Sequence, residues 1–128
     1  MPIETGLVDA NVLVYAMDAD APRRCNVTSQ VLCEFYSVVT SAKRVSNPRS
    51  PMDALAAISQ FLRFLQVLPI PPHAVELWLD LLRRHPVRGP KIFDLQIAAA
   101  MQANGVQRIY TFNTGDFAAF SELSVLTP

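Results

Sequence analysis

Two kinds of apolar pattern alternate along this chain. Short runs of consecutive apolar residues predict strands, and longer segments with apolar residues at every third or fourth position predict helices. We expect strands at residues 3–9, 25–28, 66–70, 106–112 and 123–127. We expect helices at residues 11–17, 30–42, 72–84 and 91–103, and a further helix that begins at Pro51. This alternation favours an α/β fold with a mostly parallel sheet in a single domain of residues 1–128.

Several helix ends carry recognisable signals. Ser29 is expected to cap the helix at 30–42, and Ser50 followed by Pro51 is a strong start for the next one. Asn104-Gly105 is expected to close the helix at 91–103. In the helix that begins at Pro51, the apolar spacing predicts a core-facing set made of Leu55, Ile58, Leu62 and Leu65.

Acidic residues interrupt four segments that are otherwise apolar. They are Asp9, Glu34, Asp94 and Asp116. A carboxylate among core residues must be neutralised, paired or bound to a cation. Asp9 and Asp116 also follow predicted strands, and the carboxyl ends of parallel strands meet at one edge of a sheet. Because a hard divalent cation prefers oxygen ligands, the set predicts metal-assisted chemistry on a phosphate.

Each acid also has an ordinary structural explanation. Asp9 could cap a helix, although Asn11 could do so equally well. Glu34 could pair with an Arg at the rim of its helix, and Asp116 could be a turn residue. Asp94 lies in a first helical turn, where the helix dipole favours an acid. The dipole does not explain why Asp94 shares the apolar face of that helix.

The net charge of zero means that no global basic field indicates nucleic acid. If four acids belong to the site, however, basic residues outnumber the remaining acids, and most of them are Arg, which suits phosphate contacts. The candidates for contacts with a phosphate backbone are Lys43, Arg44, Arg49, Arg88 and Lys91. Neither a signal peptide nor a membrane span is evident, so we expect a cytoplasmic protein. The two cysteines lack zinc-site spacing.

Four motifs occur in a characteristic order: LVDANVLVYAMD, SQVLCEFYSVVT, FDLQIAAAMQANGVQRIYTFNTGDF and SVLTP. In this order and at these spacings they resemble the PIN-domain ribonucleases, especially the VapC-type toxins of bacterial and archaeal toxin–antitoxin pairs. The resemblance extends over nearly the whole chain. It implies a PIN-like α/β/α sandwich and hydrolysis of RNA to products with a 5′-phosphate and a 3′-hydroxyl.

The resemblance also implies roles for individual residues and partners. One or two Mg²⁺ or Mn²⁺ ions would be held by Asp9, Glu34, Asp94 and Asp116, and Glu34 or Asp94 could take a proton from the attacking water. The residues implied to organise the pocket are Asn11, Thr111 and Asn113. Implied partners are an RNA substrate, a cognate antitoxin and a second copy of the chain. Two alternatives are a structure-specific DNA nuclease and a non-catalytic module that binds RNA or protein.

This sequence departs from the family pattern in two places. Many relatives carry an acid where this chain has Asn113, so we expect Asp116 to be the fourth acid and Asn113 to be a neutral support. Relatives usually have a full extra helix before the motif SQVLCEF, whereas residues 18–28 bridge that distance here. Either this member has lost the helix or the sequence lacks a segment at this place.

Overall fold

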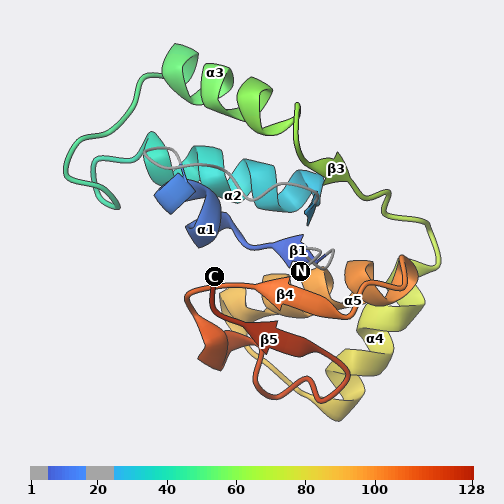
Figure 1. The fold of residues 1–128 in the computed structure, drawn as a ribbon. Helices are drawn as coiled ribbons and strands as arrows, with labels where there is room; N and C mark the ends of the chain where they lie inside the picture. Colours follow the sequence, from blue (N-terminus) through green and yellow to red (C-terminus); the bar gives the residue numbers. More distant parts are fainter. Residues whose placement is uncertain (1–5, 17–24) are drawn as a thin grey trace.

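The computed structural model describes residues 6–16 and 25–128 (Figure 1). Within these ranges five short strands form one sheet in the order β3-β2-β1-β4-β5, and every pairing is parallel. The strands are β1 (Leu7–Val8), β2 (Asn26–Val27), β3 (Gln66–Val67), β4 (Arg108–Tyr110) and β5 (Ser124–Leu126). The sheet confirms the predicted α/β fold, although each strand is shorter than its apolar run. Residues 3–5 of the first predicted strand and the segment 17–24 lie outside the described residues.

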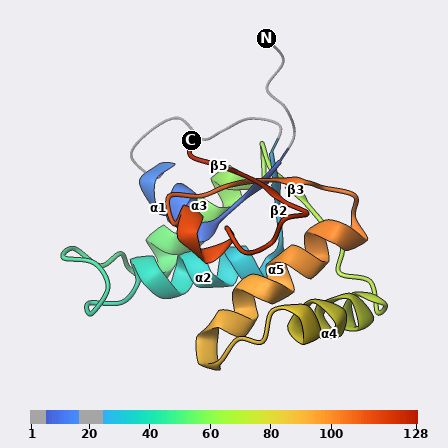
Figure 2. The same cartoon turned by 90° about the horizontal axis from the view of Figure 1, so that it is seen from below.

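The helices fall into two groups. They are α1 (Ala10–Ala16), α2 (Ser29–Val39), α3 (Pro51–Phe61), α4 (Ala74–Arg84) and α5 (Ile92–Ala103), with short 3₁₀ turns η1 (Gly89–Lys91) and η2 (Thr114–Asp116). α2 packs on α1 and α3, whereas α4 packs on α5 (Figures 1 and 2). The chain steps outward from β1 to β3 and then returns across the sheet to β4. Right-handed crossovers therefore put the second group on the opposite face of the sheet.

The residues of the central strands are apolar and buried on both faces of the sheet. Leu7 and Val8 are fully buried, as are Val27 of β2 and Ile109 of β4. Such continuous apolar runs are expected where helices cover both faces of a parallel sheet. Gly6 stands just before β1, and a Cβ there would lie 2.7 Å from the Tyr110 ring and 3.0 Å from the Arg108 carbonyl oxygen. The close strand packing therefore requires glycine at this position.

The start of α2 corrects one sequence prediction. Thr28, not Ser29, caps the helix, since its hydroxyl accepts a hydrogen bond from the Val31 amide at 3.2 Å. Thr28 is buried directly after β2, whereas Ser29 is exposed. The other predicted ends are confirmed: Ser50 caps α3, and Gly105 takes a positive φ of 67° after α5.

The buried face of α3 differs from the prediction. Leu55 and Leu62 are exposed, with 57% and 45% of their surface accessible. The core instead takes Ala54 and Phe61, and Phe61 packs edge-to-face on Phe35 of α2 at a centroid distance of 5.2 Å. The aromatic contact rotates the helix by about one residue, which moves the leucines outward. Of the other predicted core residues, Leu65 is buried and Ile58 is partly buried against the core.

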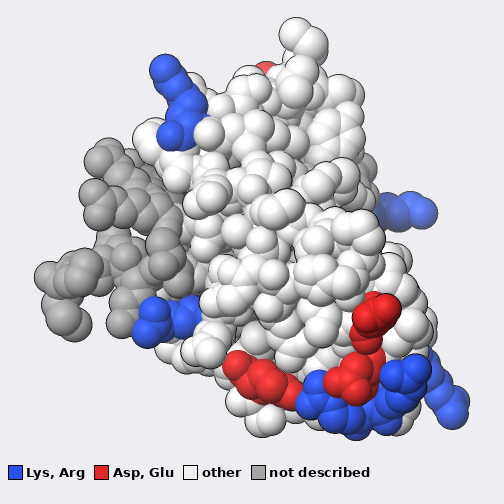
Figure 3. Space-filling view, turned by 90° about the vertical axis from the view of Figure 1, so that its right-hand side faces the viewer, with Lys and Arg blue, Asp and Glu red and all other residues white. Residues whose placement is uncertain are grey.

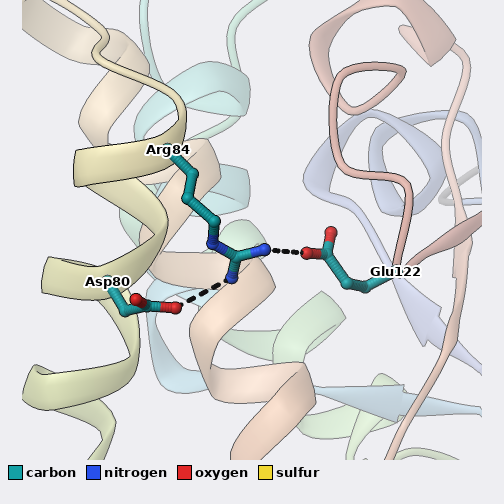
Figure 4. Close-up of polar contacts among 3 residues, drawn as sticks. All are labelled: Asp80, Arg84 and Glu122. Carbon is teal, nitrogen blue, oxygen red and sulfur yellow. Dashed lines mark hydrogen bonds and ion pairs between the residues drawn. The ribbon is translucent and has the colours of Figure 1, made fainter.

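The face of the molecule over β3 and the segment leading into α4 carries most of its charged side chains in one group at an edge, with a few more near its other margins (Figure 3). Arg84 at the end of α4 donates hydrogen bonds to Asp80, at 2.9 Å, and to Glu122 in the loop before β5 (Figure 4). Because Arg84 is largely exposed, these ion pairs contribute little to stability. In the described part of the chain, no helix is long and apolar enough to cross a membrane.

Candidate active site

Asp9 stands at the carboxyl end of the central strand, where its backbone N–H donates to the Tyr110 carbonyl at 3.0 Å. Its side chain is buried and both carboxylate oxygens accept hydrogen bonds. Oδ1 accepts from the Ala10 amide at 2.8 Å, and Oδ2 accepts from the Thr111 hydroxyl at 2.9 Å. Burial raises the pKa of the Asp9 carboxyl above its ordinary value, and the hydrogen bonds from Thr111 and Ala10 oppose that rise. The side chain is thus fixed in orientation by its neighbours.

Asn11 and Thr111 form a small network around Asp9. The Asn11 amide nitrogen donates to Asp9 Oδ2 at 3.2 Å and to the Thr111 hydroxyl at 3.1 Å. The Asn11 amide oxygen accepts from the Phe112 backbone N–H at 3.1 Å, and the Thr111 hydroxyl accepts from the Asn113 N–H at 3.0 Å. The network joins α1 to the loop after β4. It therefore fixes the positions of the segments that follow β1 and β4 relative to each other.

Glu34 reaches the site from α2. Its Oε1 accepts a hydrogen bond at 2.9 Å from the side-chain amide of Gln30, one helical turn earlier. The same amide nitrogen donates to the Phe93 carbonyl oxygen at 3.0 Å and so joins α2 to the first turn of α5. Burial raises the pKa of Glu34, the hydrogen bond from Gln30 lowers it, and the negative charge of Asp9 adds a further rise.

Asp94 is the most perturbed acid of the site. Burial raises the pKa of Asp94 to about 6, and the negative charges of Asp116, Asp9 and Glu34 reinforce the rise against the opposing charge of Lys91. A carboxyl group in that range gains and loses its proton near neutral pH. Such a pKa is typical of functional sites, where like charges are held together.

All of these acids line one open cavity of about 400 Å³. Asp9, Glu34, Asp94 and Asp116 contribute from four separate segments of the chain, together with Asn11, Asn113 and Arg44. Thr111 is fully buried beneath the cavity and acts through Asp9. The structure therefore brings the predicted acids together, as expected from the ends of parallel strands. Their roles in catalysis and metal binding stay predictions.

The donor set of the cavity fits a hard divalent cation. Every charged oxygen donor is a carboxylate, and the mutual repulsion that acts on Asp94 would be relieved by a positive ion. Among residues 6–16 and 25–128, however, no three acidic, histidine or cysteine side chains already stand at metal-ligand geometry. The carboxylates would have to move toward an ion to bind it together.

The predicted RNA-binding residues are distributed unevenly around the cavity. Arg44, in the loop between α2 and α3, lines it. Lys91 lies in η1, next to the lining residue Pro90, and its charge acts on Asp94. The other candidates, Lys43, Arg49 and Arg88, are not part of the cavity wall. The structure thus favours Arg44 and Lys91 over the rest as contacts for a ligand in the cavity.

Two residues near the acids did not stand out in the sequence. Gln30 precedes Glu34 by four positions, and that helical spacing is a signal that could have indicated the contact. Phe93 lines the cavity although half of its surface is exposed. No local pattern distinguishes Phe93 from the core residues of the apolar helix α5 to which it belongs.

The model of the PIN domain family matches residues 6–123 of this chain. The chain belongs to the PIN domain family. A comparison with curated proteins gives no match. The fold of this PIN domain is similar to that of solved VapC toxins and VapBC complexes.

VapBC2 from Rickettsia felis, solved bound to a DNA fragment from its promoter, is 17% identical, with a TM-score of 0.73 over 98% of this chain and 99% of that chain. VapC20 from Mycobacterium tuberculosis, described as a toxin that cleaves the sarcin–ricin loop, is 19% identical, with a TM-score of 0.68 over 98% and 100%. VapBC-5 from the same organism is 22% identical, with a TM-score of 0.67 over 97% and 98%. At these identities the likeness concerns the fold of the PIN domain.

Proposed function

We propose that this protein is a Mg²⁺- or Mn²⁺-dependent endoribonuclease and the toxin of a toxin–antitoxin pair. The observation that carries the proposal is the meeting of Asp9, Glu34, Asp94 and Asp116 in one cavity at the carboxyl edge of the sheet. Membership of the PIN family supports nuclease chemistry. The fold similarity to VapC20, a toxin described as cleaving the sarcin–ricin loop, supports RNA as the substrate.

Asp9, Glu34, Asp94 and Asp116 are the residues that would hold the cation. A bound divalent ion supplies positive charge that polarises the scissile phosphodiester and makes a water molecule more acidic. Asp9 enters this set in a fixed orientation, because Asn11 and Thr111 hold its Oδ2. An exposed turn residue such as Asp116 has more freedom to move toward a ligand.

Asp94 and Glu34 are the candidates for moving a proton. In the metal-free protein, burial and the neighbouring carboxylates raise the pKa of Asp94 to about 6. A carboxylate with a raised pKa is a better proton acceptor than an ordinary one. Glu34 is held toward the cavity by Gln30 and is partly buried, so it is suited to orient the attacking water. Arg44 on the cavity wall would contact the phosphate backbone of the RNA.

A cognate antitoxin and a second copy of the chain are the proposed protein partners, and the cytoplasm is the proposed compartment. The antitoxin is supported by fold similarity to a toxin–antitoxin complex from Klebsiella pneumoniae and to VapBC-5, a member of the VapBC family of toxin–antitoxin systems. An exposed apolar surface supports protein contacts of this kind. It consists of Phe64, Val67, Ile70 and Val75, around β3 and the start of α4, on the side shown in Figure 3.

The test is cleavage of a mixed RNA pool with Mg²⁺ or Mn²⁺ and with EDTA. The wild type is compared with Asp94→Asn and with a matched control, Asp53→Asn, which changes an exposed acid in the first turn of α3. We expect metal-dependent cleavage by the wild type and the control, and loss of about 100-fold or more in Asp94→Asn. Equal cleavage by all three would indicate a contaminating nuclease and contradict the proposal.

Competing DNA substrates in the same assay separate the two enzyme classes. Preferential cleavage of DNA would replace the ribonuclease function by a DNA nuclease. No metal-dependent cleavage of either nucleic acid, together with tight RNA or protein binding, would indicate a non-catalytic module.

A further inference from the structure

Aromatic side chains stand beside the acid cavity with much of their surface in solvent. Phe93, directly before Asp94, lines the cavity and is 50% exposed. Phe112 does not line the cavity itself, but it directly precedes the lining residue Asn113 and is 44% exposed. Packing in the core therefore does not explain why either position carries an aromatic side chain. A single exposed aromatic side chain is common on protein surfaces, but two next to one charged cavity need a more specific reason.

Both phenylalanines are anchored to the residues that position the acids. The Phe93 carbonyl accepts a hydrogen bond from Gln30, whose side-chain amide also donates to Glu34. The Phe112 N–H donates to Asn11, which in turn donates to Asp9. Each aromatic residue is thus fixed at the backbone relative to one catalytic candidate. The Phe93 side chain lies on the cavity wall, and the backbone of Phe112 is held to Asn11 of that wall.

A third ring extends the surface at Phe112. Tyr15 of α1 is 67% exposed and contacts Phe112 edge-to-face, with 5.6 Å between the ring centroids and an interplanar angle of 65°. The edge contact supports the Phe112 ring from one side and leaves aromatic surface accessible. Phe93 on the cavity wall and the Phe112–Tyr15 pair, which is joined to the lining residue Asn11 by the Phe112 N–H, therefore offer exposed aromatic faces near the acids.

The chemistry of the neighbouring cavity indicates what these rings bind. A ligand that brings a phosphate to carboxylates and Arg44 and also presents flat apolar surfaces is a nucleotide chain. Every nucleobase has an aromatic face, so stacking gives attraction without reading the sequence. We infer that Phe93 and Phe112 form a base-stacking site, in which unpaired bases next to the phosphate in the acid cavity lie on the two rings. This inference rests on the proposed function and adds a binding site to it.

The test measures RNA binding separately from cleavage. A short single-stranded RNA with 2-aminopurine near its centre is titrated in Mg²⁺ onto proteins that all carry Asp94→Asn, which prevents turnover under the proposed function. Phe93→Ala and Phe112→Ala are compared with Phe93→Trp, which keeps an aromatic face. The matched control is Phe64→Ala, since Phe64 is 43% exposed and precedes β3, at the edge of the sheet away from the cavity.

Stacking predicts that each Ala variant weakens binding by about 5- to 150-fold and reduces the quenching of 2-aminopurine. Phe93→Trp and Phe64→Ala should bind and quench like the parent. The affinity for the same sequence in a duplex, whose bases are already stacked, should not change in any variant.

The outcomes separate this site from the proposed function. The inferred stacking site would be contradicted by equal RNA affinities of all variants or by no RNA binding of the parent. It would also be contradicted if the Ala variants lost as much affinity for duplex RNA as for single-stranded RNA. A parent that binds through Phe93 while wild-type protein cleaves no RNA would retain the stacking site and contradict the ribonuclease function. Unchanged RNA affinity with loss of antitoxin binding in Phe93→Ala would assign the rings to the protein partner and overturn the inference.

Discussion

The hydroxyl of Thr111 donates a hydrogen bond to Oδ2 of Asp9 at 2.9 Å, across 102 positions of sequence. The same hydroxyl accepts from the Asn11 side chain and from the Asn113 N–H. One buried oxygen atom thus sets the orientation of an acid on the central strand and of the loop that follows β4.

Thr111→Val keeps the shape of the side chain and removes this oxygen. We expect the pKa of Asp9 to rise further, because a hydrogen bond that lowers it is lost. We also expect a stability loss of about 1–3 kcal/mol from the buried groups left without a partner, and a 10- to 100-fold loss of activity, roughly as for other residues that orient metal ligands. Urea unfolding and RNA cleavage test this. Thr111→Ser, which keeps the hydroxyl, should retain most of both; equal behaviour of the Val and Ser variants would contradict the role of the hydroxyl.

The raised pKa of Asp94 predicts a pH dependence of stability in metal-free protein. In the unfolded chain its pKa is near 3.8, and in the folded protein it is about 6. Between these values the folded state binds more protons, so its free energy of unfolding falls as pH rises through this window. Asp94→Asn should reduce the decline, to which the raised pKa values of Asp9 and Glu34 also contribute. It should stabilise the metal-free protein above pH 6, on the order of 1 kcal/mol after solvent screening.

Urea unfolding of both proteins in EDTA at pH 5 and pH 7.5 measures this effect. Mg²⁺ should then stabilise the wild type more than the variant at pH 7.5, because ligands that bind only the folded state raise its stability. An equal change in the free energy of unfolding between pH 5 and pH 7.5 in the wild type and the variant would contradict the raised pKa of Asp94.

Gln30 connects Glu34 with the first turn of α5, and Gln30→Leu removes both of its hydrogen bonds at similar volume. The pKa of Glu34 should rise, since this hydrogen bond lowers it, and cleavage should fall by about 10-fold. The pH profile of cleavage in the variant should shift to higher pH. Gln60→Leu, at an exposed position of α3, is the control. A variant with the wild-type pH profile would show that Gln30 has only a structural role.

The cap of α2 gives a direct test of local structure. Thr28→Ala should destabilise the protein by about 1 kcal/mol, because the Val31 amide loses its acceptor. Ser29→Ala, one residue later and exposed, should change stability by no more than about 0.5 kcal/mol. Thermal unfolding of the two variants decides between the residues, and the reverse order would restore Ser29 as the cap.

Gly6→Ala should destabilise the sheet. The added methyl group would lie 2.7 Å from the Tyr110 ring and 3.0 Å from a backbone carbonyl, and such overpacking costs about 1–3 kcal/mol. Gly115→Ala is the matched control, since nothing lies within 4 Å of the added atom. Equal melting temperatures for the two variants would contradict the close approach of β1 and β4.

The sequence predicts the acids well because each one breaks a strong apolar pattern. Asp94 shares the face of Ile97 and Ala98, both buried, and is itself half-buried at the cavity. The parallel sheet then brings Asp9 and Asp116 to the same edge. These inferences need only local periodicity and the geometry of strand ends, which the chain specifies clearly.

Other features depend on contacts between distant segments and could not be predicted locally. The rotation of α3 follows from the Phe61–Phe35 contact, which apolar spacing alone does not encode. Thr28 and Ser29 are both good caps, and the end of β2 decides between them. The sequence does not distinguish Arg44 from the other basic candidates. Only the path of the loop after α2 places Arg44 on the cavity wall.

The acids of the cavity follow β1, lie in α2 and α5, and lie in the turn after β4, so no single helix, strand or loop contains the site. A ribosome releases the segment with Asp9 first and the segment with Asp116 more than a hundred residues later. Partly synthesised chains therefore lack the cavity. Under the proposed function, a toxin chain cannot cleave RNA until the segment with Asp116 has been synthesised and has folded onto the earlier ones.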